Sequence, residues 1–141
     1  MRRYGWLMAV LLAGCQANTG PAEAPQASLT AEALAGQRWD LVRINEEKVK
    51  RGAWMQFDAA KAQVHGSSGC NQYFGQAAYD GEVLRLGNLA GTRRLCPDMA
   101  LEDQFLRVFQ HDFKVAEVDG QLRLTGTQSG QVMYFTPSVM P

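Results

Sequence analysis

Residues 66–109 contain most of the signals that restrict the fold of this chain. The segment opens with GSSGCNQYFGQAAYDG, continues through LRLG and TRRLCPDM, and ends in the amphipathic run ALEDQFLRVF. It holds Cys70 and Cys96 together with the one convincing helical pattern of the chain. Outside it, short runs alternate apolar and polar residues, which is typical of β-strands. A single helix packed against a sheet is therefore expected.

Eight short strands are expected along the chain. In the first, Trp39 and Leu41 point to one face of the strand and Asp40 to the other, the pattern of a half-buried strand. Short strands joined by tight turns favour antiparallel pairing, so we predict an α+β fold in which a curved antiparallel sheet forms a partial barrel. The expected strands are residues 37–44, 54–58, 63–66, 76–79, 83–86, 113–118, 121–125 and 132–136.

Two Asp-Gly pairs predict hairpin turns. Asp80-Gly81 lies between two of the expected strands, and Asp119-Gly120 lies between two others. A type I′ turn needs positive φ at both central residues, and this pair tolerates it. A type I′ hairpin is expected at both places.

The N-terminus is predicted to be a lipoprotein signal peptide covering residues 1–14. Arg2 and Arg3 supply positive charge, and residues 6–12 form an apolar run too short to span a bilayer. The ending LAGC resembles a bacterial lipobox, which implies that Cys15 is lipidated with acyl chains such as palmitate. A plain signal peptide with an accidental cysteine is the alternative. No aspartate follows Cys15, since Gln16 stands there; by resemblance to lipoprotein sorting this favours the outer membrane, facing the periplasm.

Residues 15–33 are expected to be the lipidated cysteine followed by a flexible tether. The run ANTGPAEAPQASLTAEA contains Pro21 and Pro25 and has no apolar periodicity. Such a composition buries too little surface to offset the entropy of ordering. The globular domain is therefore predicted over residues 34–141, held to the membrane through Cys15.

The helix is predicted to begin at Pro97, because proline fits the first helical position. One half of the helix is apolar, apart from Glu102. A carboxylate that faces a core needs a partner, and we expect Glu102 to pair with Arg93 or to bond Thr92 and nearby amides. The alternative is that Glu102 lies at the edge of the face and reaches water. A catalytic role has little support, because no second acid or base is placed beside it.

Cys70 and Cys96 are predicted to form a disulfide. An even pair in an oxidising compartment favours this reading, and the bond would be worth about 3.5 kcal/mol by the chain-entropy model. Three alternatives have weaker support. A redox pair would show C-x-x-C; a zinc site using His65 and His111 matches no common ligand spacing; and a Cys70 nucleophile with His65 would place the two side chains on opposite faces of a strand.

Two further features suggest structural roles or exclude a class of function. The GSSG sequence lacks the lysine and the spacing of a phosphate-binding loop, so a tight turn or a bulge is expected there, with Asn71 adopting a left-handed backbone or capping neighbouring amides. The 14 basic and 14 acidic residues balance, and no basic stripe interleaved with aromatic residues is present. Nucleic-acid binding therefore has little support.

The motifs GSSGCNQYFG, LRLGNLAGTRRLCPDM and ALEDQFLRVF together resemble the META domain of HslJ-like bacterial proteins. The resemblance covers about residues 34–136. It implies a small domain with a curved antiparallel sheet and one helix, without an established enzymatic reaction or cofactor. The matching positions, which we interpret as mainly structural, are Gly69, Cys70, Asn71, Thr92, Arg93, Cys96, Pro97 and Glu102.

The sequence thus favours a non-enzymatic lipoprotein of the cell envelope that acts by binding. The resemblance associates it with stress tolerance of the heat-shock or antibiotic type. The alternative is a pilotin-like carrier, whose partial barrel would accept an acyl chain or a lipoprotein tail in a groove lined by Trp39, Trp54 and Met55. An envelope protein or an acyl ligand is the expected partner.

Overall fold

The computed structural model describes residue 20 and residues 27–139. The predicted signal peptide and Cys15 lie outside the described residues. In the described part of the chain, neither helix is long and apolar enough to cross a membrane. The elements are α1 (Ala31–Ala35), β1 (Arg38–Ile44), β2 (Glu47–Lys48), β3 (Ala53–Asp58), β4 (Gln63–Ser68), β5 (Gln72–Tyr79), β6 (Val83–Gly91), α2 (Ala100–Val108), β7 (Phe113–Val118), β8 (Gln121–Gly126) and β9 (Val132–Pro137).

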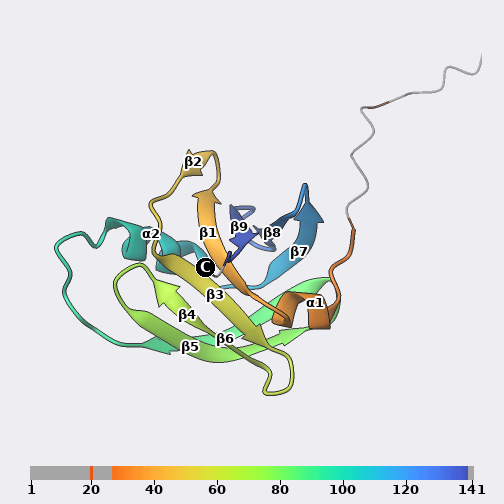
Figure 1. Cartoon of the computed structure of the whole chain (residues 1–141), viewed down its shortest axis with the longest axis horizontal. Helices are drawn as coiled ribbons and strands as arrows, with labels where there is room; N and C mark the ends of the chain where they lie inside the picture. The colour runs from red at the N-terminus through yellow and green to blue at the C-terminus, as the bar shows by residue number, and fades with distance from the viewer. Residues whose placement is uncertain (1–19, 21–26, 140–141) are drawn as a thin grey trace, which may run out of the picture.

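The sheet closes into a barrel (Figure 1). Strands β1 and β3 to β9 pair antiparallel with their neighbours, and β1 returns to pair with β9 from Trp39↔Pro137 to Ile44↔Met133. The short β2 is an extra strand that pairs with the end of β1. The predicted α+β class is correct, but the predicted partial barrel is wrong. Closure satisfies the backbone groups that open β1 and β9 edges would leave exposed.

All eight predicted strands are present, and several are longer than predicted. β5 begins four residues before the predicted segment and β6 continues to Gly91, five residues beyond it. The alternation of the first strand is confirmed, since Trp39 and Leu41 are buried in the barrel. Trp54 is only half-buried. It faces outward from β3, where the guanidinium of Arg38 lies 4.4 Å from its ring centroid.

The barrel has a weak seam between β6 and β7. These strands share only the pairs Val83↔Lys114 and Leu84↔Phe113 and then diverge. Helix α2 packs beside this seam, where an aromatic chain fills the interior: Phe109 stacks 5.6 Å from Phe113 and 4.9 Å from Phe105. The helix is therefore part of the core, as its predicted apolar face requires.

The folded domain begins before the predicted boundary at residue 34. Leu29 is buried, and its carbonyl accepts a hydrogen bond of 2.7 Å from the Tyr79 hydroxyl. Thr30 caps α1 by accepting from the Ala33 amide. The tether predicted through residue 33 is thus too long, because residues 27–33 contribute a buried side chain and a helical turn that the low apolar content of the segment concealed.

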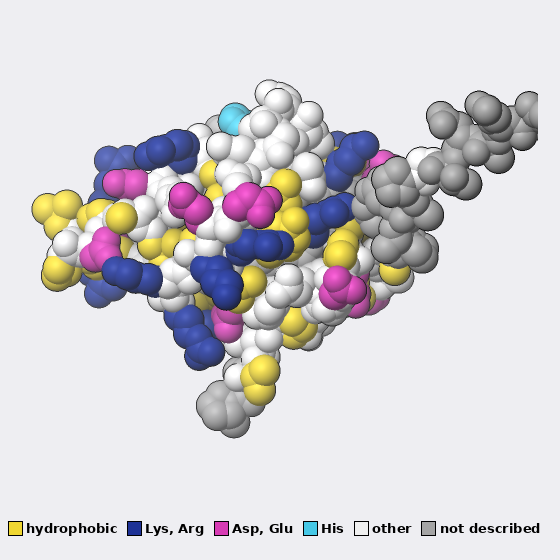
Figure 2. All heavy atoms as spheres, turned by 90° about the horizontal axis from the view of Figure 1, so that it is seen from above, with side chains coloured by type: hydrophobic (Ala, Val, Ile, Leu, Met, Phe, Trp, Pro, Cys, Tyr) yellow, Lys and Arg dark blue, Asp and Glu magenta, His cyan; other side chains and the backbone are white. Residues whose placement is uncertain are grey.

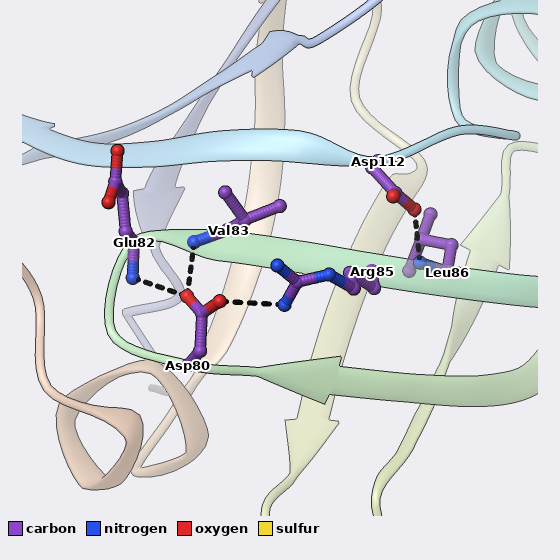
Figure 3. A network of polar contacts seen from close by, with 6 residues as sticks. All are labelled: Asp80, Glu82, Val83, Arg85, Leu86 and Asp112. Carbon is purple, nitrogen blue, oxygen red and sulfur yellow. Dashed lines mark hydrogen bonds and ion pairs between the residues drawn. The ribbon is translucent and has the colours of Figure 1, made fainter.

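The two Asp-Gly turns differ from one another. Asp119 and Gly120 have φ of 51° and 74°, which confirms a type I′ turn there. At the other hairpin only Gly81 has positive φ, so the predicted type I′ turn is wrong. The Asp80 carboxylate instead accepts from the amides of Glu82 and Val83 and from Arg85 (Figure 3). These bonds organise the turn that follows the last strand pair, Tyr79↔Leu84.

The Asp80 network predicts an acid-sensitive contribution to stability. The Val83 amide, the Arg85 guanidinium and the Glu82 amide hold the Asp80 pKa well below its ordinary value of 3.8. A carboxyl whose pKa is depressed on folding stabilises the fold above its unfolded pKa and loses that contribution as the pH falls towards its folded pKa. Asp80→Asn is therefore expected to lower stability at pH 7, and the deficit is expected to shrink below about pH 4.

Urea unfolding of wild type and Asp80→Asn at pH 7, 4 and 2 measures this. Asp119→Asn is the matched control, since it removes a carboxylate from the other Asp-Gly turn and asparagine tolerates positive φ. A deficit for Asp80→Asn that stays constant down to pH 2 would contradict the prediction.

Candidate functional site

A groove runs between β6 and α2, beside the seam of the barrel. Two clefts of about 370 and 420 Å³ share the lining residues Leu89 and Leu106 and therefore lie side by side; we name them together the β6–α2 groove. One wall is the end of β6 with the segment 92–95, and the other is α2. Its lining includes Leu89, Gly91, Arg93, Leu95, Asp103 and Leu106.

The outer end of the groove carries exposed apolar and basic side chains. Leu95 is 94% exposed, and both Arg93 and Arg94 are exposed. Residues 92–99 project from the barrel in Figure 1, and the same end of the molecule in Figure 2 shows hydrophobic side chains beside Lys and Arg. Leu95, Arg93 and Arg94 are therefore accessible to a ligand at this end of the groove.

Glu102 lies buried at the floor of the groove, 5% exposed. Its carboxylate accepts from the Ser68 hydroxyl at 2.9 Å and from the Asn71 side-chain amide at 3.0 Å to each oxygen. The prediction that Glu102 faces the core and bonds a nearby amide is confirmed, whereas the predicted contacts with Arg93 and Thr92 are wrong. Arg93 is exposed and forms no ion pair with any described residue, whereas the hydroxyl and amide replace it without burying a cation.

Asn71 links the floor of the groove to its wall. Its side-chain oxygen accepts from the Arg94 amide at 2.7 Å and from the Thr92 hydroxyl at 2.9 Å. Its side-chain nitrogen donates to the Arg94 carbonyl at 3.0 Å as well as to Glu102. Of the two predicted roles for Asn71, capping is therefore correct. The left-handed backbone belongs to Gly69, with φ of 122°.

Gly69 is also needed for close packing. A Cβ placed there would lie 3.2 Å from Cγ of Leu101 on α2. Both the positive φ and the approach of the helix therefore favour glycine.

The predicted disulfide between Cys70 and Cys96 is confirmed, with the two Cα atoms 6.1 Å apart. It joins the turn after β4 to the segment that precedes α2. Both cysteines are engaged with each other, so the zinc and nucleophile alternatives are not formed by these residues. His65 lies on the outside of the barrel against Trp54, with ring centroids 5.9 Å apart.

The predicted start of the helix at Pro97 is wrong. Pro97 lies in a bend, and α2 begins at Ala100 after the N-cap Met99. Asp98 accepts from the Ala100 amide and from Lys50 Nζ, both at 3.0 Å. These contacts hold the Asp98 pKa below its ordinary value, the Lys50 bond being the largest cause. The disulfide and this pair hold residues 96–99 in a non-helical approach to α2.

The sequence-predicted site residues thus fall into two groups. The structure brings most of them together around the groove and leaves two outside its hydrogen-bond network. Those in contact with one another are Cys70, Asn71, Thr92, Cys96 and Glu102, with Gly69 packed against α2; Arg93 and Pro97 bond none of the others.

Sequence reasoning missed Ser68. The strand predicted over residues 63–66 continues to Ser68, and Val64, Gly66 and Ser68 all point inward. Extending the alternation by two residues would have placed the Ser68 hydroxyl inside the barrel. The groove residues Leu89 and Leu106 were also missed, because only the spatial approach of α2 to β6 brings them together.

The arrangement offers recognition chemistry rather than an evident reaction. Ser68 contacts Glu102, but no described imidazole or amine reaches the pair. The described residues contain no group of three or more His, Cys, Asp or Glu side chains suited to a metal ion. What the groove presents is an apolar lining, a strand edge and a free guanidinium.

The groove expected from Trp39, Trp54 and Met55 does not exist. Trp39 and Met55 are packed in the barrel interior, at 2% and 0% exposure, whereas Trp54 faces outward. Strand alternation separates neighbours such as residues 54 and 55 to opposite faces.

The chain belongs to the META domain family, whose pattern matches residues 32–139. Two solved structures share the fold. An NMR structure of a protein from Burkholderia xenovorans is 22% identical, with a TM-score of 0.60 over 89% of this chain and 99% of that one. A second NMR structure is 23% identical, with a TM-score of 0.62 over 77% of this chain and 95% of that one. Comparison with the curated proteins finds no match.

Glu102→Gln is expected to destabilise the domain by about 1–3 kcal/mol. Both carboxylate oxygens lie 3.0 Å from Asn71 Nδ2, so the new amide nitrogen would face this donor in either orientation, and at the Oε1 position it would also remove the acceptor of the Ser68 hydroxyl. Asp103→Asn is the matched control, since this neighbouring carboxylate is exposed. Denaturant unfolding at pH 7 measures both. Equal stability of Glu102→Gln and wild type would contradict the assignment.

The double variant Cys70→Ser/Cys96→Ser is expected to lower stability by about 3.5 kcal/mol, because the 26-residue separation restricts the unfolded chain. Thermal unfolding without reductant measures the loss. In reductant, wild type and the double variant should unfold at similar temperatures. A double variant that melts with oxidised wild type would show that the bond does not stabilise the fold.

Proposed function

We propose that this protein is a non-enzymatic lipoprotein of the cell envelope whose META domain acts by binding a partner at the β6–α2 groove. The observation that carries the proposal is the combination of the LAGC leader with an exposed groove built on a rigid barrel. A lipid anchor holds a domain at a membrane surface without a spanning helix. The confirmed disulfide suits an oxidising compartment outside the cytoplasm.

The membrane is the outer membrane in this proposal, with the domain facing the periplasm. Gln16 after the lipidated cysteine supports that location. The biological setting is a response to envelope stress of the heat-shock or antibiotic-tolerance type, as the HslJ-like resemblance suggests. No cofactor is part of the proposed activity.

The anchor is tested by expressing the full chain and a Cys15→Ser variant in a bacterium fed an alkyne-tagged palmitate analogue. Wild type is expected to take up the label and to sediment with the outer membrane. Cys15→Ser is expected to lose the label and to leave the membrane fraction. Unlabelled wild type, or equal sedimentation of both proteins, would contradict the proposal.

An acyl chain is the second candidate occupant. The apolar residues Leu89, Leu95 and Leu106 along the groove favour it, although the tryptophan-lined cavity first expected for a carrier is absent. Native mass spectrometry of the chain purified from an envelope separates the two. A retained mass of fatty-acid size, lost in a Leu89→Asp variant, would support a carrier; a bare mass would support a protein partner.

A further inference from the structure

Strand β6 has a free edge along the groove. On one side it pairs with β5 from Tyr79↔Leu84 to Tyr73↔Gly91, with a register shift between Leu86 and Leu89. On the other side its pairing with β7 ends at Leu84. Beyond that point the Leu86 amide donates to Asp112 Oδ1 (Figure 3), and no described residue bonds the outer edge from Gly87 to Gly91.

The phase of the ladder shows which backbone groups face outward. The Thr92 amide donates to the carbonyl of Gln72 on β5 at 3.0 Å, so Thr92 and Gln72 occupy a hydrogen-bonded position of the ladder. Hydrogen-bonded and non-hydrogen-bonded pairs alternate along an antiparallel ladder. Ala90 therefore bonds β5, whereas the N–H and C=O groups of Leu89 and Gly91 point into the groove. Leu89 and Gly91 are two residues apart, which is the spacing at which a strand bonds an antiparallel neighbour.

The opposite wall lies at a distance that leaves room for a guest. The clefts of about 370 and 420 Å³ both include Leu89 and Leu106, so each wall of the groove, β6 and α2, contributes an apolar side chain. Leu106 is half-buried on α2, and Leu89 is half-buried on β6. A strand edge facing a helix across an apolar gap is a geometry in which extended peptides bind by strand addition.

The charges of the groove select the guest. The Glu102 carboxylate is occupied by Ser68 and Asn71, and the Arg94 guanidinium donates to the Cys70 carbonyl. Arg93 is exposed and lacks an ion pair among the described residues, so it is the cation available to a ligand.

On the other wall, Asp103 disfavours an acidic group beside α2. The complementary guest is acidic at the Arg93 end and apolar along the rest of the groove.

We propose that the β6–α2 groove binds an extended segment of a partner protein as an additional strand on β6. The backbone of the segment bonds Leu89 and Gly91, its apolar side chains contact Leu106 and Leu89, and an acidic side chain lies beside Arg93. This proposal rests on the proposed binding function of the same site and names the chemistry of its partner.

The probe is a phage-displayed library of random 12-residue peptides, selected against the full chain purified from the envelope in detergent. The selected sequences are expected to alternate apolar and polar residues and to carry an acidic residue at one end. The best peptide is then synthesised and its affinity is measured by fluorescence anisotropy. Amide exchange of Leu89 and Gly91, followed by NMR, is expected to slow when it binds.

Leu89→Pro is the decisive variant. The Leu89 N–H points away from β5, so proline removes a donor from the groove and leaves the β5 ladder intact. Leu89→Ala is the control for the lost side chain. We expect Leu89→Pro to bind at least about tenfold more weakly than Leu89→Ala, a loss of one hydrogen bond. Arg93→Glu should weaken binding and favour a peptide whose acidic residue is replaced by lysine.

Peptide N-methylation provides a test that does not depend on the folding of a variant. N-methyl groups on the residues whose amides face β6 should abolish binding. N-methyl groups on the alternate residues, whose amides face away from β6, should not. An empty selection, equal affinity of Leu89→Pro and Leu89→Ala, or equal binding of both N-methylated peptides would overturn the proposal. Dimerisation of the chain through β6, abolished by Leu89→Pro, would assign the edge to a second copy and also overturn it. None of these outcomes depends on the Cys15 anchor.

Discussion

The buried Asn71 side chain is the contact on which the site depends. It bonds the backbone of Arg94 on one side and the carboxylate of Glu102 on the other. The Asn71 carboxamide thereby holds together the segment 92–95, the start of α2 and the turn after β4. Such networks are costly when incomplete, and here the Asn71 oxygen has two donors and its nitrogen three acceptor contacts. The segment from Thr92 to Arg94 is therefore attached both to the barrel and to α2.

This polar network and the aromatic core fix α2 at the seam. Phe105 and Phe109 bury the apolar face of the helix, and Glu102 fastens its first turn. With the helix in this position, β7 diverges from β6 and the strand edge beyond Leu84 stays unpaired. The same packing that completes the core thus creates the groove. Natural proteins usually protect such edges, so an uncovered one beside an apolar lining suggests a binding role.

The sequence predicted the local features of the fold well. Alternation identified every long strand, and the pair Cys70 and Cys96 predicted the disulfide. The closure of the barrel could not be predicted, because β1 and β9 lie about ninety residues apart and their pairing leaves no local signal. The same applies to the β6–α2 groove, whose two walls meet only in three dimensions. Local chemistry also misplaced the helix start, since the Cys70–Cys96 disulfide and the Asp98–Lys50 contact, both with distant parts of the chain, hold residues 96–99 outside the helix.

A double-mutant cycle between Asn71→Ala and Glu102→Ala tests most directly whether this network anchors the site. Unfolding free energies of wild type, the two single variants and the double variant give the coupling of the two side chains. A coupling of about 1–3 kcal/mol is expected, because each single variant leaves a buried polar partner unsatisfied. Additive losses, with no coupling, would contradict the account and would mean that the helix and the 92–95 segment are held independently of each other.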